Sequence, residues 1–222
     1  MPATESLAAH FEALHAERVA SWTPEALAGN IAQRRDLLAR FDPAATAQVG
    51  DRLAPAALID SAGGTLSLEA LTAQGPAVLI FFRYAGCPAC NIALPYYDRQ
   101  LRPALDAAGI PLVAISPQLP ERLAEIRTRH ALGFPVASDP DNRLAKRLGI
   151  TFVPGLTPDP PPPGWIGEIT GTGSWDLPQP TVVILDQDCT IRFIDVRPDW
   201  LARTEAPEIL AALERIGRKV AA

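Results

Sequence analysis

The chain has few of the residues that usually mark metal sites, secreted disulfide scaffolds or nucleic-acid surfaces. Its 222 residues include three cysteines, three histidines and one methionine. Secreted scaffolds carry more cysteines, spread along the chain, so a structural disulfide framework is not expected. The formal net charge of −5, with no concentration of basic residues, argues against nucleic-acid binding.

Long apolar runs are also missing. The longest, residues 77–82, suits one buried strand and is far too short to cross a bilayer. Residues 1–20 have neither a basic start nor a long apolar stretch, so no secretory signal is expected. A cytoplasmic location is therefore the default expectation.

Two of the three cysteines lie three positions apart, in the motif Cys87-Pro88-Ala89-Cys90. In a reducing compartment, a close pair of this kind is more often catalytic or metal-binding than structural. The motif is therefore the first positive indication of a function.

The order of the predicted elements indicates an α/β fold. Apolar residues at helical spacing, with Thr23-Pro24 as a second helix start, predict two helices within residues 6–41. Buried strands are expected at 77–84 and 110–116, and a third short strand at 134–137. The helices expected between and after these strands span 91–108, which should kink or break at a proline, then 121–132 and 141–148.

The rest of the chain contains a proline-rich insert followed by a hairpin. The insert, at about residues 154–173, should form a stiff extended loop. Runs at 181–185 and 190–195 on either side of a short polar link predict a β-hairpin, and a final helix is expected at 206–220. Residues 1–47 are interpreted as a helical extension and residues 48–222 as one domain.

The position of the cysteine pair favours redox chemistry. A cysteine at the start of a helix faces unpaired N–H groups and the positive end of the dipole, which stabilise a thiolate. This predicts Cys87 as the nucleophile, with Cys90 one turn further on and able to form a disulfide with it. Arg83 is close enough in sequence to add positive charge.

Two other interpretations of the pair remain open at this point. A zinc site requires further ligands, and the three histidines show no paired spacing. Two inert buried cysteines are the other alternative, because free cysteine is often part of a core.

The chain resembles the peroxiredoxin-like branch of the alkyl hydroperoxide reductase/thiol-specific antioxidant family over about residues 49–213. The residues that carry the resemblance are Val49-Gly50-Asp51 with Pro55, 78–90 followed by Asn91, 112–118 (LVAISPQ), Ser138-Asp139 with Asn142, Gly173-Ser174-Trp175 with Leu177, and 180–186 with Ile191-Arg192. The resemblance implies a thioredoxin-like three-layer α/β/α fold with a mixed central sheet, and a thiol-dependent redox role.

The chain also departs from the pattern of this family. Mainstream members have threonine or serine three residues before the reactive cysteine, where this chain has Tyr84, and an arginine from a later strand edge, where it has Pro180. A proline there resembles the cis-proline of thioredoxins, so Gln179–Pro180 is a candidate cis bond. Arg83, Tyr84 and Pro180 are accordingly the candidate substrate-binding residues.

Three functions follow as hypotheses. The first is a peroxidase that reduces hydrogen peroxide or alkyl hydroperoxides through Cys87 and Cys90, is recycled by a thioredoxin- or glutathione-type reductant, and needs no metal or organic cofactor. The second is a thiol–disulfide oxidoreductase, and the third a non-enzymatic partner-binding module that uses the N-terminal helices and the insert. Cys189 in the hairpin turn is either a tolerated turn residue or a resolving cysteine, and a homodimer is plausible.

Overall fold

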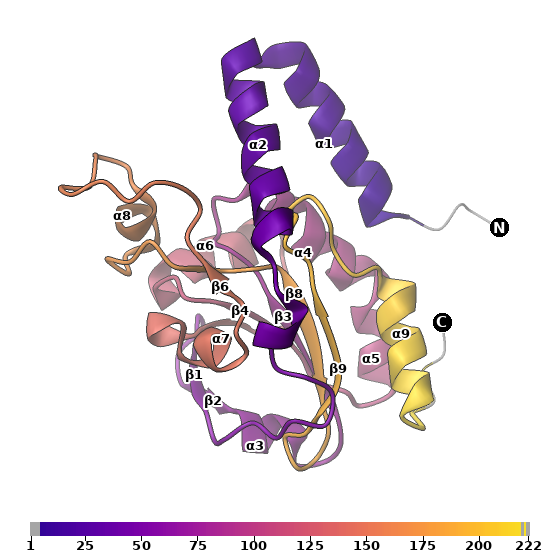
Figure 1. Ribbon diagram of the computed structural model, residues 1–222. Coiled ribbons are helices and arrows are strands. Elements are labelled where there is room, and N and C mark those ends of the chain that lie inside the picture. Colours follow the sequence, from indigo (N-terminus) through magenta and orange to yellow (C-terminus); the bar gives the residue numbers. More distant parts are fainter. Residues whose placement is uncertain (1–4, 219, 221–222) are drawn as a thin grey trace.

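The computed structural model describes residues 5–218 and 220, and its centre is a seven-stranded mixed sheet (Figure 1). The strand order is β2-β1-β5-β4-β3-β8-β9, in which β3–β4 and β4–β5 are parallel and the other pairs are antiparallel. The strands are β1 (Ala57–Asp60), β2 (Thr65–Ser67), β3 (Ala77–Phe81), β4 (Leu112–Ser116), β5 (Val136–Ser138), β8 (Thr181–Leu185) and β9 (Ile191–Val196). The predicted central strands and the hairpin are thereby confirmed.

Each face of the sheet carries its own apolar core. Successive side chains of a strand point to opposite faces, so Val78 and Ile80 of β3 lie in one core while Leu79 and Phe81 lie in the other. The first core is covered by α4 (Pro88–Gln100), α6 (Pro120–Arg129) and α9 (Ala206–Arg215), and the second by α3 (Leu68–Thr72) and α7 (Arg143–Arg147). This is the three-layer arrangement that the family resemblance implied.

The helix predicted over residues 91–108 is broken, as its prolines suggested. Helix α4 continues through Pro95, and the break falls at Leu101, before α5 (Arg102–Ala107), which has Pro103 in its first turn. Proline is well tolerated there because the first N–H groups of a helix have no partner within the helix.

The N-terminal residues form the two predicted helices, α1 (Leu7–Ser21) and α2 (Pro24–Arg40), which lie antiparallel at the top of Figure 1. The side chain of Thr23 accepts the N–H of Ala26, which is the cap expected for the second helix. Leu7 and Phe11 of α1 are buried in the same core as the cysteine pair. The extension is therefore packed into the structure that surrounds the pair.

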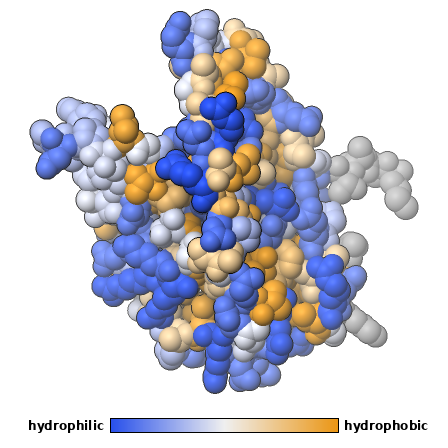
Figure 2. Space-filling view, viewed as in Figure 1, coloured by the Kyte–Doolittle hydropathy of each residue, from blue (hydrophilic) through white to orange (hydrophobic). Residues whose placement is uncertain are grey.

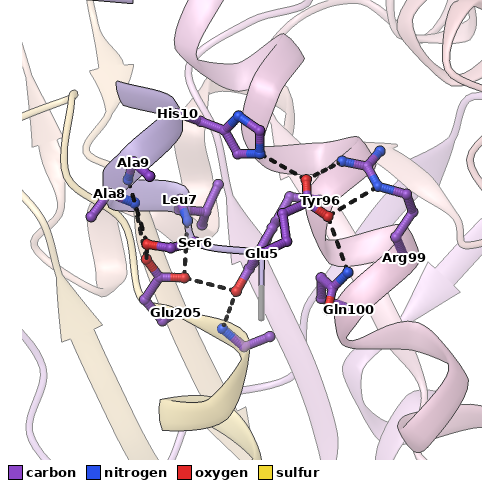
Figure 3. A network of polar contacts seen from close by, with 11 residues as sticks. Glu5, Ser6, Leu7, Ala8, Ala9, His10, Tyr96, Arg99, Gln100 and Glu205 are labelled. Carbon is purple, nitrogen blue, oxygen red and sulfur yellow. Dashed lines mark hydrogen bonds and ion pairs between the residues drawn. The ribbon is translucent and has the colours of Figure 1, made fainter. Parts of the chain in front are cut away.

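One carboxylate holds the start of α1 against the body (Figure 3). Glu205, at the start of α9, accepts the backbone N–H groups of Leu7 and Ala8 at 3.1 and 3.0 Å, and the hydroxyl of Tyr96 at 2.7 Å. It thus satisfies donors that every helix leaves unpaired at its N-terminus. This contact fixes the end of α1 to both α4 and α9.

Polar and apolar side chains alternate on the visible surface of the helical extension (Figure 2). Its largest exposed apolar residues are Val19, Trp22, Ile31 and Leu38. None of the helices within residues 5–218 combines the length and the apolar character needed to cross a membrane.

Some short elements were not predicted. Helix α3 begins at Leu68, directly after β2, and a two-stranded sheet joins β6 (Thr151–Phe152) to β7 (Leu177–Pro178). Helix α8 (Ile166–Thr170) lies within the proline-rich insert, beside Trp165, whose ring packs 4.7 Å from that of Trp175. The final helix α9 ends at Arg215, earlier than predicted, and the end of the predicted span includes residue 219, which lies outside the described residues.

Candidate active site

The Cys87–Cys90 motif lies where the chain leaves β3 and enters α4, as the sequence predicted. Cys87 is the residue before the helix, with extended backbone angles (φ −74°, ψ 119°), and Pro88 occupies the first helical position. Proline suits this position because its φ is already helical and its missing N–H is not needed there. Cys90 follows in the first turn of α4, so both thiols lie at the helix N-terminus.

The loop ahead of the helix is held by amide side chains. Asn91 donates from Nδ2 to the carbonyls of Ala85 and Cys87, at 2.7 and 2.9 Å. The Oε1 of Gln118, which follows β4, accepts the Ala85 N–H at 2.8 Å. These hydrogen bonds give Asn91 and Gln118, two residues of the family resemblance, a physical role: they fix the backbone that presents Cys87.

Asn91 is itself held in place by a residue that sequence reasoning left unassigned. Its Oδ1 lies 2.8 Å from Nε2 of His130 and 3.1 Å from Nη1 of Arg129, both at the end of α6. Burial lowers the pKa of His130, with the neighbouring Arg129 acting in the same direction. A neutral imidazole can still donate one hydrogen bond to the amide oxygen.

Both thiols of the pair are free and buried. Cys87 is 1% exposed and Cys90 is not exposed. The residues on either side of Cys87, Gly86 and Pro88, are exposed, so Cys87 lies directly beneath the surface. The side chains of both cysteines are covered by neighbouring residues.

The surroundings of the pair shift the pKa values of the two thiols in opposite directions. A hydrogen bond with Cys90, followed by burial, raises the pKa of Cys87 well above its usual value. Burial also acts to raise the pKa of Cys90, but the hydrogen bond from Cys87 and the charges of Arg203 and Arg83 outweigh it and lower that pKa to about 5. These causes favour negative charge on Cys90 in the reduced pair, whereas the sequence argument considered only the helix N-terminus and predicted Cys87 as the nucleophile.

Arg83 and Tyr84 both lie beside the pair. The guanidinium of Arg83 is half-buried, 5.3 Å from the Trp200 ring and 5.8 Å from the Tyr84 ring, and its Nε has no hydrogen-bond partner among the described residues. Its backbone carbonyl accepts the Ser116 hydroxyl at 3.0 Å. The Tyr84 ring covers Gly86, where a Cβ would lie 3.0 Å from a ring carbon.

Two further arginines reach the site from distant parts of the chain, and the sequence did not indicate either. Arg203 approaches Cys90, with Nη2 to Sγ at 3.8 Å, and is 9% exposed. Arg18 of α1 is 4% exposed, and its guanidinium lies 4.9 Å from the Trp200 ring. Neither has a sequence motif around it, because only the tertiary fold brings it to the motif.

The structure corrects the expectation of a cis bond at Pro180. The Gln179–Pro180 bond is trans, and the cis bond of the described chain is Asp159–Pro160. Gln179 donates its N–H to the carbonyl of Ile150 at 2.7 Å, and the Pro180 carbonyl accepts from Arg197 at 2.8 Å, so the chain runs extended into β8. Pro180 is buried beside the end of β3, because its neighbour Thr181 pairs with Phe81.

Cys189 lies far from the pair. It belongs to the core on the opposite face of the sheet, and it sits in the turn after Leu185, which pairs with the first residue of β3. The five-residue length of β3 alone, about 13 Å, exceeds the span of a disulfide. The geometry therefore contradicts an intramolecular resolving role, and the left-handed φ of 57° explains why glycine would suit this turn.

The described residues place no third metal ligand beside the cysteines. In the part of the chain that the structure describes, no cluster of three or more His, Cys, Asp or Glu residues is arranged to hold a metal ion. The groups closest to the thiols are instead cationic and aromatic.

Comparison with known proteins gives the same family along most of the chain. The model of the AhpC/TSA family matches residues 49–194. Among curated proteins, bcp of Haemophilus influenzae, which is named as a peroxiredoxin, is 32% identical over 83 residues, or 35% of this chain and 50% of the relative. The chain thus spans half the length of that relative.

Solved structures share the fold at lower identity. The peroxidoxin BcpB of Mycobacterium tuberculosis superimposes with a TM-score of 0.59 at 23% identity, covering 76% of this chain and 97% of the other. The bacterioferritin comigratory protein of Xanthomonas campestris, which is described as having alkyl peroxide reduction activity, superimposes with a TM-score of 0.57 at 15% identity, covering 73% of this chain and 92% of the other. These likenesses establish the thioredoxin-like fold.

Proposed function

The chain belongs to the AhpC/TSA family, and we propose that it is a thiol peroxidase in which Cys87 and Cys90 undergo a dithiol–disulfide cycle. The observation that carries the proposal is the buried pair of free thiols at the start of α4, with the guanidinium of Arg203 at 3.8 Å from Cys90. A family relative described as reducing alkyl peroxides supports the same substrate class.

In the proposed reaction, Cys87 attacks the O–O bond of hydrogen peroxide or an alkyl hydroperoxide. The proton of Cys87 first moves to Cys90, which leaves Cys87 as the thiolate and Cys90 as the thiol. A sulfur–oxygen bond forms, the O–O bond breaks, and hydroxide or alkoxide leaves and takes up a proton. The product at Cys87 is a sulfenic acid.

Cys90 then resolves this intermediate. Its sulfur attacks the sulfenic sulfur, water leaves, and a Cys87–Cys90 disulfide forms. The spacing suits this step, because Cys87 is the residue before α4 and Cys90 lies in the first turn of the same helix. An external reductant, either one dithiol of the thioredoxin type or two monothiols of the glutathione type, then supplies two electrons and restores both thiols by exchange.

Cys87 is the proposed attacking residue because exposed residues flank it, whereas Cys90 lies beneath it in the helix. The low pKa of Cys90 makes that residue the resting site of the charge and the acceptor of the Cys87 proton. Tyr84 and Arg83 precede the pair in the loop before α4, and they are the proposed contacts for the peroxide and for the leaving oxygen. Pro180, which is buried beside the end of β3, is proposed to form part of the substrate site.

Mass spectrometry after one equivalent of peroxide tests the cycle. The wild-type chain should lose two hydrogens and show a Cys87–Cys90 linkage, with Cys189 still free. Cys90→Ser should stop at a sulfenic acid on Cys87, and Cys87→Ser should consume no peroxide. A reactive Cys87→Ser variant with oxygen on Cys90 would reverse the two roles, and an unreactive wild-type chain would refute the peroxidase.

Thiol–disulfide exchange with protein substrates is the second candidate, favoured by the CxxC spacing of the pair. The trans bond at Pro180 removes the thioredoxin-like feature that had supported it. Turnover of insulin and glutathione disulfide, measured beside peroxide consumption, separates the two activities. Fast disulfide turnover with slow peroxide consumption would favour this candidate.

A further inference from the structure

The N-terminal extension contributes a buried cation beside the thiol pair. The guanidinium of Arg18 lies between two indole rings, 4.9 Å from that of Trp22 and 4.9 Å from that of Trp200. Only 4% of the residue is exposed. Cation–π contacts hold the group in position, but they do not neutralise its charge.

The charge of Arg18 has no carboxylate partner among residues 5–218 and 220, and its buried Nη1 has no hydrogen-bond acceptor there. The neighbouring Arg34 shows the contrast, because it forms two 2.7 Å hydrogen bonds to the carboxylate of Asp199. A buried donor without an acceptor costs free energy. An arginine needed only to dock α1 would gain from a partner of the kind that Arg34 has.

Two negative charges act on Arg18, that of Cys87 and, more weakly, that of Glu17 on the same helix. Burial lowers the pKa of Arg18, and these two charges act in the opposite direction. Trp200 links the two sites, since the guanidinium of Arg83 lies 5.3 Å from the same ring. Arg203 completes the group at 3.8 Å from Cys90.

We propose that Arg18 is a positioning residue of the thiol pair, which holds negative charge at Cys87 when the proton moves to Cys90. This inference rests on the proposed function. It assigns α1 a part in the reaction: the helix supplies a cation from outside the thioredoxin-like body. The charged and titratable groups facing the pair are then Arg18 from α1, Arg83 and Tyr84 from the loop before α4, and Arg203 from the segment before α9, with Arg34 compensated by Asp199.

The test is the pH profile of cysteine alkylation by iodoacetamide in the full-length reduced protein, read separately for Cys87 and Cys90 by mass spectrometry. Arg18→Met keeps the packing between the indoles and removes the charge. At pH values below the plateau, we expect alkylation of the pair to slow about tenfold, which corresponds to an upward pKa shift of about one unit. Arg18→Lys should remain within about threefold of the wild-type rate.

The matched control is Arg35→Met, which removes one charge from an exposed position of the same extension, where the side chain is 78% exposed. Alkylation profiles that coincide for Arg18→Met and Arg35→Met would overturn the proposal. Arg18→Gln serves as the uncharged variant if Arg18→Met does not fold. Failure of both to fold, with a folded Arg18→Lys, would make Arg18 a purely structural residue and would also overturn it.

The alkylation readout requires no peroxide, so the two proposals fail separately. A wild-type chain that does not react with peroxide, combined with a shifted alkylation profile in Arg18→Met, would refute the peroxidase and keep the role of Arg18. Normal peroxide turnover by the wild-type chain, combined with an unchanged alkylation profile in Arg18→Met, would support the peroxidase and refute the role of Arg18.

Discussion

Nη2 of Arg203 lies 3.8 Å from Sγ of Cys90, although 113 positions separate the two residues in the sequence. The Nη1 of the same guanidinium donates to the carbonyls of Trp200 and Ala202, both at 2.6 Å, so the group has little freedom to move away. A fixed cation next to a buried sulfur stabilises the thiolate over the thiol. The titration of the cysteine pair depends on this contact.

Ionisation of the pair should therefore begin well below neutrality. With the pKa of Cys90 lowered to about 5 and that of Cys87 raised, one thiolate should persist from neutral pH down to about pH 5 and be lost below it. The far-ultraviolet absorbance of the thiolate, followed as a function of pH, measures this titration, and Cys90→Ser serves as the reference. Arg203→Met should move the titration upward by about one to two units, and a midpoint unchanged from the wild type would contradict the assignment.

Asn91 should contribute to stability and reactivity together. Asn91→Ala removes two hydrogen bonds to the loop before Cys87, at 2.7 and 2.9 Å. We expect a loss of about 1–3 kcal/mol in the free energy of unfolding, measured with urea, and slower peroxide consumption. Gln100→Ala is a control in the same helix, since Gln100 bonds to Glu5 and not to the loop. Equal peroxide rates for Asn91→Ala and the wild type would show that the loop needs no such support.

Attachment of the N-terminal extension should weaken in acid. A side-chain hydrogen bond from Arg99 is the main reason that the pKa of Glu5 falls from 4.5 to about 2, against the opposing effect of burial. Because the folded pKa lies below the unfolded value, this stabilisation is fully present above about pH 4.5 and is lost as the pH falls toward 2. Urea unfolding across that window should show a pH dependence that Glu5→Gln reduces, and an identical dependence in both proteins would argue against the contact.

Gly149 should tolerate no side chain. Its φ is +68°, and a Cβ there would lie 2.3 Å from the carbonyl oxygen of Ala45 in the segment that links α2 to the body. Gly149→Ala should cost about 2–4 kcal/mol through strain and the collision.

Alanine substitutions at two other glycines separate the cost of backbone strain from the cost of the collision. Gly109 has a φ of +64° but open space, so Gly109→Ala should cost about 1–2 kcal/mol from backbone strain alone. Gly155 has open space and no left-handed φ, so Gly155→Ala should change stability by less than about 1 kcal/mol. Thermal and urea unfolding of the three variants measure the order, and a Gly149→Ala variant as stable as Gly109→Ala would exclude the collision.

Local patterns predicted the elements that depend mainly on their own residues. The apolar runs that became β3, β4 and β8 are buried on both faces, which is why they contain almost no polar residue. The capping residue Thr23 and the following proline marked the start of α2 for the same local reason. Short elements such as β6 and β7, two residues each, escaped prediction because pairing with each other is what makes them strands.

The spacing of Cys87 and Cys90 and their place between a buried strand and a helix were determined by the sequence alone, since both follow from neighbouring residues. The stabilisation of negative charge at Cys90 depends on tertiary structure, because Arg203 approaches it from a segment 113 positions away in the sequence. The bond before Pro180 is trans, whereas the resemblance to thioredoxins suggested a cis bond, and local sequence did not distinguish the two. Electrostatic fields add over all charges close in space, and sequence separation does not report that distance.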